Sequence, residues 1–274
     1  MKTEGYSLPC LDRLHASLKS KYGSAPVLES GLPHFLFRGE RGEWTHTLSS
    51  LDRHWHGGVS PEAWGELDNI TAFIMQVPLP KQRLDPKLAG AFAQHYGLPT
   101  QGFDFTADIS IATFFAGDSS GPPFASPRGC IAVLDVAEAL RGPCALFDLR
   151  NRPESRRAQK QKAFGLIHSG FMVDDFEDLK RPEISNKLGL KWLRFGHCPG
   201  EHIFLESLGL PIDLLDHTND EFAIIPQLTV DAYTTLNGPI LVETATILAR
   251  NIPNVGRTRE ENIQRWSNGP ATET

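Results

Sequence analysis

The fold is decided by the stretch Gln94-His95-Tyr96-Gly97-Leu98-Pro99-Thr100-Gln101-Gly102-Phe103-Asp104-Phe105-Thr106, which is followed by an apolar run at 109–116. Upstream, Asp85-Pro86 predicts a helix start, because aspartate accepts from free amide donors and proline fits the first helical position. Gly97 predicts the end of that helix, and Asp108 predicts the cap of a second helix over 109–116. We therefore expect a loop held between two buried helices.

That loop is a candidate binding site, because rigid scaffolds position functional loops. Its spacing alone leaves structural roles open. Asp104 and Thr106 could cap a turn, His95 could be a satisfied, half-buried histidine, and Tyr96 could be a core residue with its hydroxyl bonded to backbone.

The composition is that of an ordinary globular chain, with 274 residues, 40% hydrophobic and 22% charged. This length suffices for one large domain with additions. A net charge of -6 argues against a uniformly basic nucleic-acid surface. Six arginines and lysines in 150–162 form a local basic cluster, which predicts either a solvated helix face or a phosphate-facing surface.

The four cysteines, Cys10, Cys130, Cys144 and Cys198, contain no Cys-x-x-Cys pair. We therefore expect reduced thiols and no metal site, since zinc normally takes at least three protein ligands. No run approaches the ~20 apolar residues that a membrane-spanning helix needs. These features predict a soluble, cytoplasmic protein with no membrane partner.

Along the chain, apolar residues recur at helical spacing over 11–22, and a short aromatic strand at 34–37 leads directly into Arg38. A guanidinium at a strand end needs anionic or carbonyl partners, so Arg38 is either half of an ion pair, for example with Asp104, or a ligand clamp. Strands are predicted at 129–136, 144–149 and 164–171, and a polar, frayed tail at 256–274. The predicted fold class is α+β.

The segment 94–106 resembles the signature of the FRG domain, through Gln94 to Thr100, Asp104, Thr106 and the small-residue run 112–116. The naming motif is present as Phe37-Arg38-Gly39, followed by Ser49-Ser50-Leu51.

Two later stretches extend the resemblance. Residues 157–161 are similar to the family's Arg…Gln block, and 205–210 are similar to its late Leu-Gly segment. This predicts an FRG domain over 30–225, a helical segment over 1–29, and a helix with a polar tail, packed on the same domain, over 226–274. Gln101 and Ala163 depart from the family's usual Arg and Gly, and the first departure would weaken an anion contact.

FRG domains resemble the ADP-ribosyltransferase fold, which implies a split, curved, mixed β-sheet with surrounding helices and NAD as substrate in the cleft between its halves. Gly39 would let the backbone approach the nicotinamide carboxamide, Arg38 would grip ribose or phosphate, and Tyr96 would offer a stacking face. The NAD-binding set that the resemblance implies is Phe37, Arg38, Gly39, Gln94, His95, Tyr96, Thr106 and Phe115.

The implied catalytic residues are Arg38, Tyr96, Asp104 and Gln161. Cleavage of the glycosidic bond develops positive charge on the ribose, which a carboxylate stabilises better than the neutral amide of Gln161. Asp104, Glu40 or a carboxylate elsewhere is therefore expected to supply that term.

The resemblance implies an NAD-dependent ADP-ribosyltransferase-like toxin or defence effector. Its partners would be a macromolecular acceptor, either nucleic acid or protein, and a neutralising antitoxin. Two alternatives stay open: a non-catalytic binding module, and an NAD glycohydrolase that uses the same cleft without an acceptor.

Overall fold

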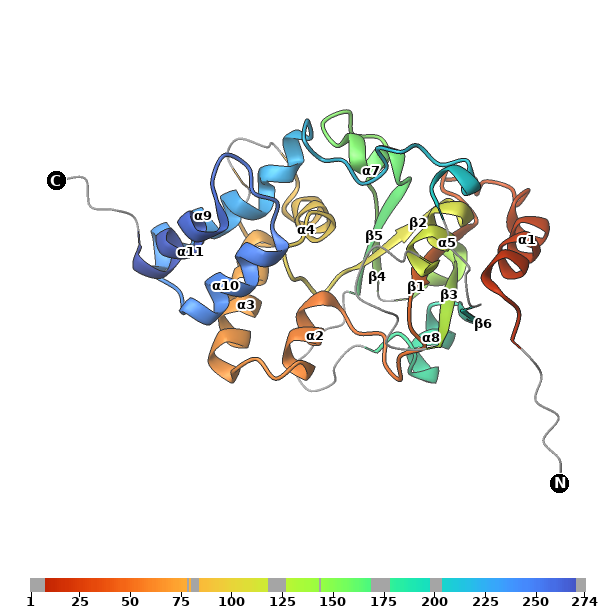
Figure 1. Ribbon diagram of the computed structural model, residues 1–274, viewed down its shortest axis with the longest axis horizontal. Helices are drawn as coiled ribbons and strands as arrows, with labels where there is room; N and C mark the ends of the chain where they lie inside the picture. The colour runs from red at the N-terminus through yellow and green to blue at the C-terminus, as the bar shows by residue number, and fades with distance from the viewer. Residues whose placement is uncertain are drawn as a thin grey trace, which may run out of the picture.

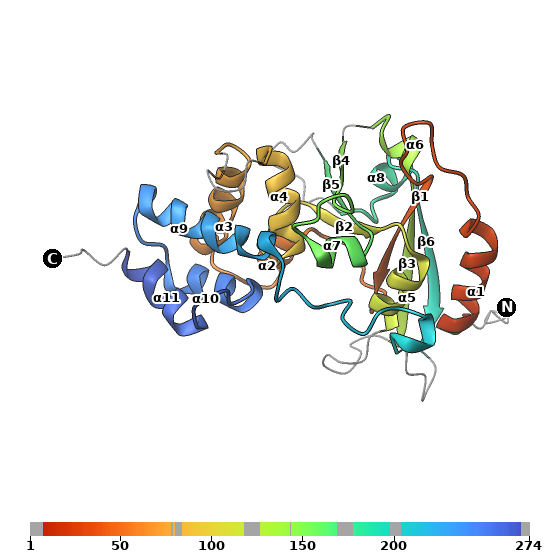
Figure 2. The ribbon, with the colours of Figure 1, turned by 90° about the horizontal axis from the view of Figure 1, so that it is seen from above.

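The computed structural model describes residues 8–77, 79, 84–117, 127–142, 144–168, 178–197 and 204–269. A six-stranded sheet lies beside a lobe of helices, with further helices on the sheet's faces (Figure 1, Figure 2). The fold is α+β, as the sequence predicts.

The strands are β1 (Phe35–Glu40), β2 (Phe103–Thr106), β3 (Arg128–Asp135), β4 (Cys144–Asp148), β5 (Ala163–His168) and β6 (Leu190–Gly196). The helices are α1 (Leu11–Tyr22), α2 (Ser50–His56), α3 (Pro61–Ile74), α4 (Pro86–His95), α5 (Ile109–Gly117), α6 (Val136–Ala139), α7 (Arg156–Lys160), α8 (Pro182–Lys187), α9 (Ile225–Asn237), α10 (Val242–Asn251) and α11 (Arg259–Asn268). Two 3-10 turns, η1 (Glu206–Leu208) and η2 (Glu221–Ile224), precede α9.

The strand order is β4-β5-β2-β1-β3-β6, and every pairing between these strands is antiparallel, so the expectation of a mixed sheet was wrong for the described strands. We predicted a loop at Phe103–Thr106, and this was wrong, because these residues form the central strand β2. The central pair is also the weakest one: β1 and β2 are in register only at Phe37 and Thr106. Two three-stranded halves therefore meet at one point of the sheet.

Local sequence signals set the helix starts as expected. Asp85 accepts from the backbone N–H groups of Lys87 and Leu88 at 2.9 and 3.3 Å, and Pro86 opens α4. Asp108 likewise accepts from Ser110 N–H at 2.8 Å at the start of α5. Gly97 follows α4 with φ +98, a backbone conformation that favours glycine. The two helices that frame β2 thus begin where their capping residues stand.

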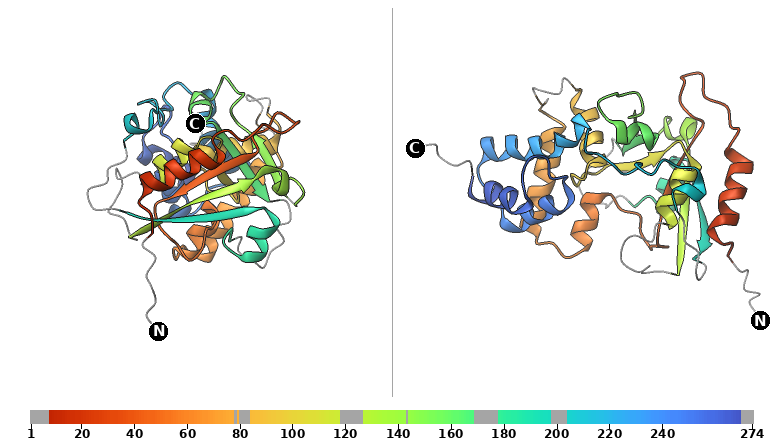
Figure 3. Two further views of the ribbon diagram at one scale, coloured as in Figure 1. Left: turned by 90° about the vertical axis from the view of Figure 1, so that its right-hand side faces the viewer. Right: turned by 45° about the horizontal axis from the view of Figure 1, so that its top comes forward.

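The two faces of the sheet bury different sets of side chains. Helices α1 and α5 cover one face, where Leu14, Leu18, Phe37, Ile131 and Phe195 form one apolar cluster. The left view of Figure 3 shows α1 lying across this side. A second cluster, on α6, α8 and the strands, includes residues that alternate with the first set, as the two-residue period of a strand requires. Both faces are therefore fixed by packing.

The helical lobe contains α3, α4, α9, α10 and α11, which lie together at one end of the molecule (Figure 1). Our prediction of a frayed tail over 256–274 was wrong for Arg259–Asn268. Thr258 and Glu261 form a reciprocal capping box that starts α11, and Trp266 is fully buried. A polar sequence can still form a docked helix when one large aromatic side chain anchors it.

The cysteines also depart from expectation, since Cys10 is disulfide-bonded whereas Cys130 and Cys144 are free thiols. Cys198 lies outside the described residues. Within the part of the chain that the structure describes, no helix has the length and apolar character required to cross a membrane.

Gly39 is required by packing between β1 and α5. A Cβ at this position would lie 1.9 Å from the Ala112 carbonyl oxygen and 2.7 Å from the Ala116 nitrogen, which are backbone atoms of α5. The close approach of helix and strand therefore explains this glycine without a ligand.

We expect Gly39→Ala to lower the free energy of unfolding by at least about 1–3 kcal/mol, because overpacking forces backbone shifts. The matched control is Gly65→Ala in the middle of α3, where a Cβ meets nothing within 4 Å. That substitution should raise stability by about 0.5–1 kcal/mol. Urea unfolding of both variants measures the difference, and equal stability of Gly39→Ala and the wild type would contradict the packing argument.

Candidate functional site

A cleft of about 980 Å³ opens where β1 and β2 separate. The register of these strands, continued beyond Phe37 and Thr106, would bring Gly39 opposite Asp104, but the strands are not paired there. Helices α2, α5 and α7 and the end of α4 complete the walls. Among the predicted site residues, the lining contains Phe37, Arg38, Gly39, His95, Asp104, Thr106, Phe115 and Gln161.

Arg38 spans the gap between the two strands. Its Nη1 donates to the Asp104 carbonyl oxygen at 2.9 Å, and its Nε donates to Glu40 Oε1 at 3.3 Å. The side chain is 16% exposed. Arg38 therefore satisfies a β2 carbonyl group that lacks a β1 partner at this position, and its ion pair is with Glu40 and not with the Asp104 carboxylate.

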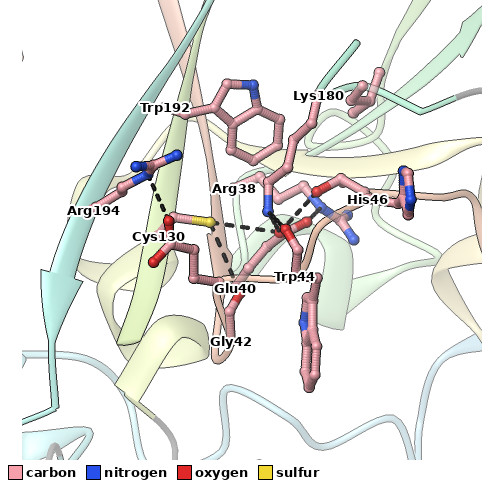
Figure 4. A network of polar contacts seen from close by, with 12 residues as sticks. Arg38, Glu40, Gly42, Trp44, His46, Cys130, Lys180, Trp192 and Arg194 are labelled. Carbon is pink, nitrogen blue, oxygen red and sulfur yellow. Dashed lines mark hydrogen bonds and ion pairs between the residues drawn. The ribbon is translucent and has the colours of Figure 1, made fainter. Parts of the chain in front are cut away.

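Glu40 lies at the centre of a buried polar network, which Figure 4 shows together with Arg38, Lys180 and Cys130. Glu40 Oε2 accepts from Thr47 Oγ1 at 2.9 Å and lies 3.5 Å from Lys180 Nζ. Cys130 Sγ is 3.6 Å from the same oxygen, and burial, followed by the charge of Glu40, raises the pKa of that thiol to about 12. Glu40 is thus held by the protein, and the Cys130 thiol stays protonated.

Asp104 presents a carboxylate to the cleft, with its side chain 40% exposed. Gln94 Nε2 donates to Asp104 Oδ2 at 3.3 Å, while Gln94 Oε1 accepts from Thr100 Oγ1. Gln94 does not line the cleft, so it acts on Asp104 from behind. Among the described residues, Asp104 Oδ1 has no hydrogen-bond partner.

His95 lies beneath Asp104 as an uncharged side chain. Its Nδ1 is 4.0 Å from Asp104 Oδ1, which is longer than a hydrogen bond, and its Nε2 has no partner among the described residues. Burial is the main cause that lowers the pKa of His95, to about 4, although the charge of Asp104 opposes it. Desolvation therefore outweighs the neighbouring carboxylate.

Tyr96 does not line the cleft, and the expectation that it offers a stacking face there was wrong. Its side chain is 1% exposed, and its hydroxyl donates to Asp220 Oδ2 and is hydrogen-bonded to Ser155 Oγ. Asp220 also accepts from the backbone N–H groups of Arg156 and Arg157 at 2.9 and 2.8 Å. Tyr96 therefore helps to fix the start of α7.

Helix α7 carries Arg157 into the cleft, and α2 carries Arg53. Neither guanidinium forms an ion pair with a carboxylate in the described part of the chain. Arg157 lies over the Tyr96 ring, 5.8 Å from its centroid, and its Nε has no hydrogen-bond partner among the described residues. Arg53 is exposed by surface area, yet desolvation and then the charge of Arg38 lower its pKa. The exposure of Arg53 and its lowered pKa are both explained by a concave site, where protein surrounds a group that solvent still reaches.

Gln161 and Thr106 tie the cleft floor together. Gln161 Nε2 donates to the Leu214 carbonyl oxygen at 3.0 Å, and the Gln161 carbonyl oxygen accepts from Thr106 Oγ1 at 2.7 Å. Gln161 is 4% exposed. Its amide is thus committed to the protein, although the residue lines the cleft.

Among the described residues, the lining carries four arginines, Arg38, Arg41, Arg53 and Arg157, and two carboxylates, Glu40 and Asp104. The whole chain has a net charge of -6, so these lining residues are more positive than the chain as a whole. Such a site attracts anions, because low-dielectric walls focus the field.

The basic cluster of 150–162 contributes less positive charge to the cleft than its six arginines and lysines suggest. Arg150 pairs with Asp148 at 2.7 Å, Lys160 with Asp213 at 2.5 Å, and Lys162 with Asp108 at 2.6 Å. Of this cluster, Arg157 is the basic side chain that lines the cleft.

The fold and the site together define an α+β domain with an arginine-rich cleft where its two central strands separate. Residues 33–122 match the family model of the FRG domain, so the chain carries an FRG domain. No curated protein and no solved structure matches the chain. Arg157, Gln161 and Ala163 line the cleft but lie beyond the matched residues, so the cleft is completed by later parts of the chain.

Acidification should reveal the buried neutral His95. Between pH 6.5 and about 4 the unfolded chain binds a proton at this histidine while the folded protein does not. The free energy of unfolding should therefore fall across this window, by about 3 kcal/mol from His95 alone.

The control is His95→Gln, which cannot titrate and should lose less stability over the same window. Denaturant unfolding of both proteins at a series of pH values isolates the difference, since the carboxylates contribute to both. Parallel pH dependences would show that His95 is not held neutral.

Proposed function

We propose that the chain is an NAD-dependent ADP-ribosyltransferase-like enzyme that binds NAD in the cleft between β1 and β2. The observation that carries the proposal is that two guanidinium groups without a carboxylate partner among the described residues, Arg53 and Arg157, share a lining with the Asp104 carboxylate. The cations suit a pyrophosphate, and the carboxylate suits a ribose that becomes positively charged. A volume of about 980 Å³ also lies within the range of small-molecule sites.

Each group has a role in this proposal. NAD supplies a ribose carbon that loses nicotinamide, with the bonding electron pair leaving on the nicotinamide nitrogen. Asp104 stabilises the positive charge on the ribose, and Arg157 and Arg53 hold phosphate oxygens. The acceptor nucleophile bonds to the ribose carbon and releases its proton to solvent. Arg38, fixed by Glu40 and the Asp104 carbonyl oxygen, keeps the two strands at the separation that the ligand needs.

Of the carboxylates expected to stabilise the charge, we choose Asp104, and we give Gln161 no contact with the ribose because its amide already donates to Leu214. The same observation favours a second candidate, a non-catalytic module that binds NAD without cleaving it. We propose a toxin or defence effector as the biological role, with a macromolecular acceptor, nucleic acid or protein, and a neutralising antitoxin as its partners. An NAD glycohydrolase would use the same groups and water.

The test is incubation of the purified protein with labelled NAD, with and without cell lysate, following free nicotinamide and labelled macromolecules. Asp104→Asn should lower nicotinamide release about 100-fold or more, since it removes a charge that acts in the transition state. Arg157→Ala should weaken NAD binding roughly 10- to 100-fold through loss of a charge-assisted contact. Arg250→Ala, an exposed arginine on α10, is the matched control and should change neither quantity.

The outcomes separate the candidate functions. Nicotinamide release with labelled protein or nucleic acid supports the transferase, and release without any label supports the glycohydrolase. NAD binding that Arg157→Ala weakens, with no nicotinamide released by the wild type, supports the binding module. A wild-type protein that neither binds nor cleaves NAD would contradict the proposal.

A further inference from the structure

The lining of the cleft carries a partly exposed aromatic side chain, Trp44. It is 48% exposed, although large aromatic side chains usually bury most of their area. It follows β1 closely in sequence, in the segment between Glu40 and α2, and Figure 4 shows its ring extending away from the Glu40 network. The chain thus places a large planar surface in the same cleft as the arginines.

Two contacts restrain Trp44, one at its backbone and one at its ring. The Trp44 carbonyl oxygen accepts from Lys180 Nζ at 2.6 Å, and Lys180 in turn lies 3.5 Å from Glu40 Oε2. A Cβ on Gly42 would lie 2.6 Å from the Trp44 ring atoms Cε2 and Cζ2, so the indole packs directly against this glycine. An exposed ring that the backbone holds in place is preorganised for binding, because it loses little conformational freedom when a ligand arrives.

Two further planar rings stand on the same lining. The rings of His46 and His56 are nearly parallel, with an interplanar angle of 15° and centroids 6.3 Å apart. His46 Nδ1 is 2.7 Å from Asp178 Oδ2, and the His46 side chain is 58% exposed. The cleft therefore combines exposed flat rings with a surplus of positive charge. A flat heterocycle joined to phosphate has the matching chemistry.

We propose that Trp44 is the base-stacking residue of the cleft and that it binds the purine ring of a nucleotide. The identity of the ring as the adenine of NAD rests on the proposed function. The stacking itself requires no catalysis. The adenosine half of the ligand then lies at the Trp44 end of the cleft, and the nicotinamide half lies toward Asp104.

The test measures the affinity of the full-length protein for three probes, NAD, AMP and nicotinamide mononucleotide, by calorimetry and by tryptophan fluorescence. Trp44→Ala should weaken binding of NAD and AMP roughly 5- to 150-fold, the range found when an aromatic partner is removed from a stacked base. Affinity for nicotinamide mononucleotide should stay within about 2-fold, because that probe lacks the purine. Trp44→Phe keeps a stacking face and should restore most of the affinity for AMP.

Trp55→Ala is the matched control, because Trp55 is 37% exposed on α2 but does not line the cleft. It should leave all three affinities unchanged. The Trp44 variants should fold, since the bond to Lys180 uses the backbone carbonyl group, and circular dichroism with thermal unfolding checks this.

Equal weakening of AMP and nicotinamide mononucleotide by Trp44→Ala would overturn the assignment, and so would unchanged affinity for AMP. A wild type that binds AMP through Trp44 but neither binds nor cleaves NAD would leave the stacking residue in place and overturn the proposed function. If Trp44→Ala leaves the rate of NAD cleavage at limiting NAD unchanged, the stacking role of Trp44 is overturned and the proposed function stands. A wild type that binds none of the three probes would overturn both.

Discussion

The hydrogen bond from Arg38 to the Asp104 carbonyl oxygen is the contact on which the cleft depends. Two adjacent strands that separate would leave backbone groups without partners, and an unpaired buried carbonyl group is unfavourable. Here a side chain replaces the missing ladder bond at 2.9 Å. Because the guanidinium is longer than a backbone amide, it satisfies the carbonyl group while keeping β1 and β2 apart.

The remaining walls are fixed by contacts that are distant in sequence. Gly39 lets α5 approach β1 from one side, and Asp220 holds the first backbone N–H groups of α7 from the other. Tyr96 connects that helix to the end of α4 through Asp220. The FRG match covers 33–122, whereas α7 and Asp220 lie later in the chain. The cleft is therefore a product of the whole chain, and the helical lobe contributes by holding α7.

Much of the fold follows from local signals in the sequence. The starts of α4 and α5 were predicted correctly, because Asp85 and Asp108 satisfy free amide donors within a few residues of themselves. The strand β2 was taken for a loop because it is only four residues long and directly follows Gly102. Its conformation comes from pairing with β5, about 60 residues away. Strand formation by such pairing leaves no local pattern.

The site was predicted in part for the same reason. Motif order correctly placed Arg38, His95 and Asp104 on one cleft. Tyr96 follows α4 directly, and the sequence could not show that its hydroxyl meets Asp220, which is 124 residues later. Arg53 and Trp44 carry no motif, and their importance comes from exposure inside a concave surface. The sequence signal that could have suggested Trp44 is a tryptophan that follows the end of a strand within a few residues.

A crystal structure of Asp104→Asn with NAD would show directly whether the cleft binds this ligand, because this variant should bind NAD without cleaving it. We expect density for NAD between β1 and β2, with the phosphates at Arg53 and Arg157 and the nicotinamide ribose beside residue 104. NAD bound elsewhere on the protein, or a cleft closed by pairing of Gly39 with residue 104, would contradict it.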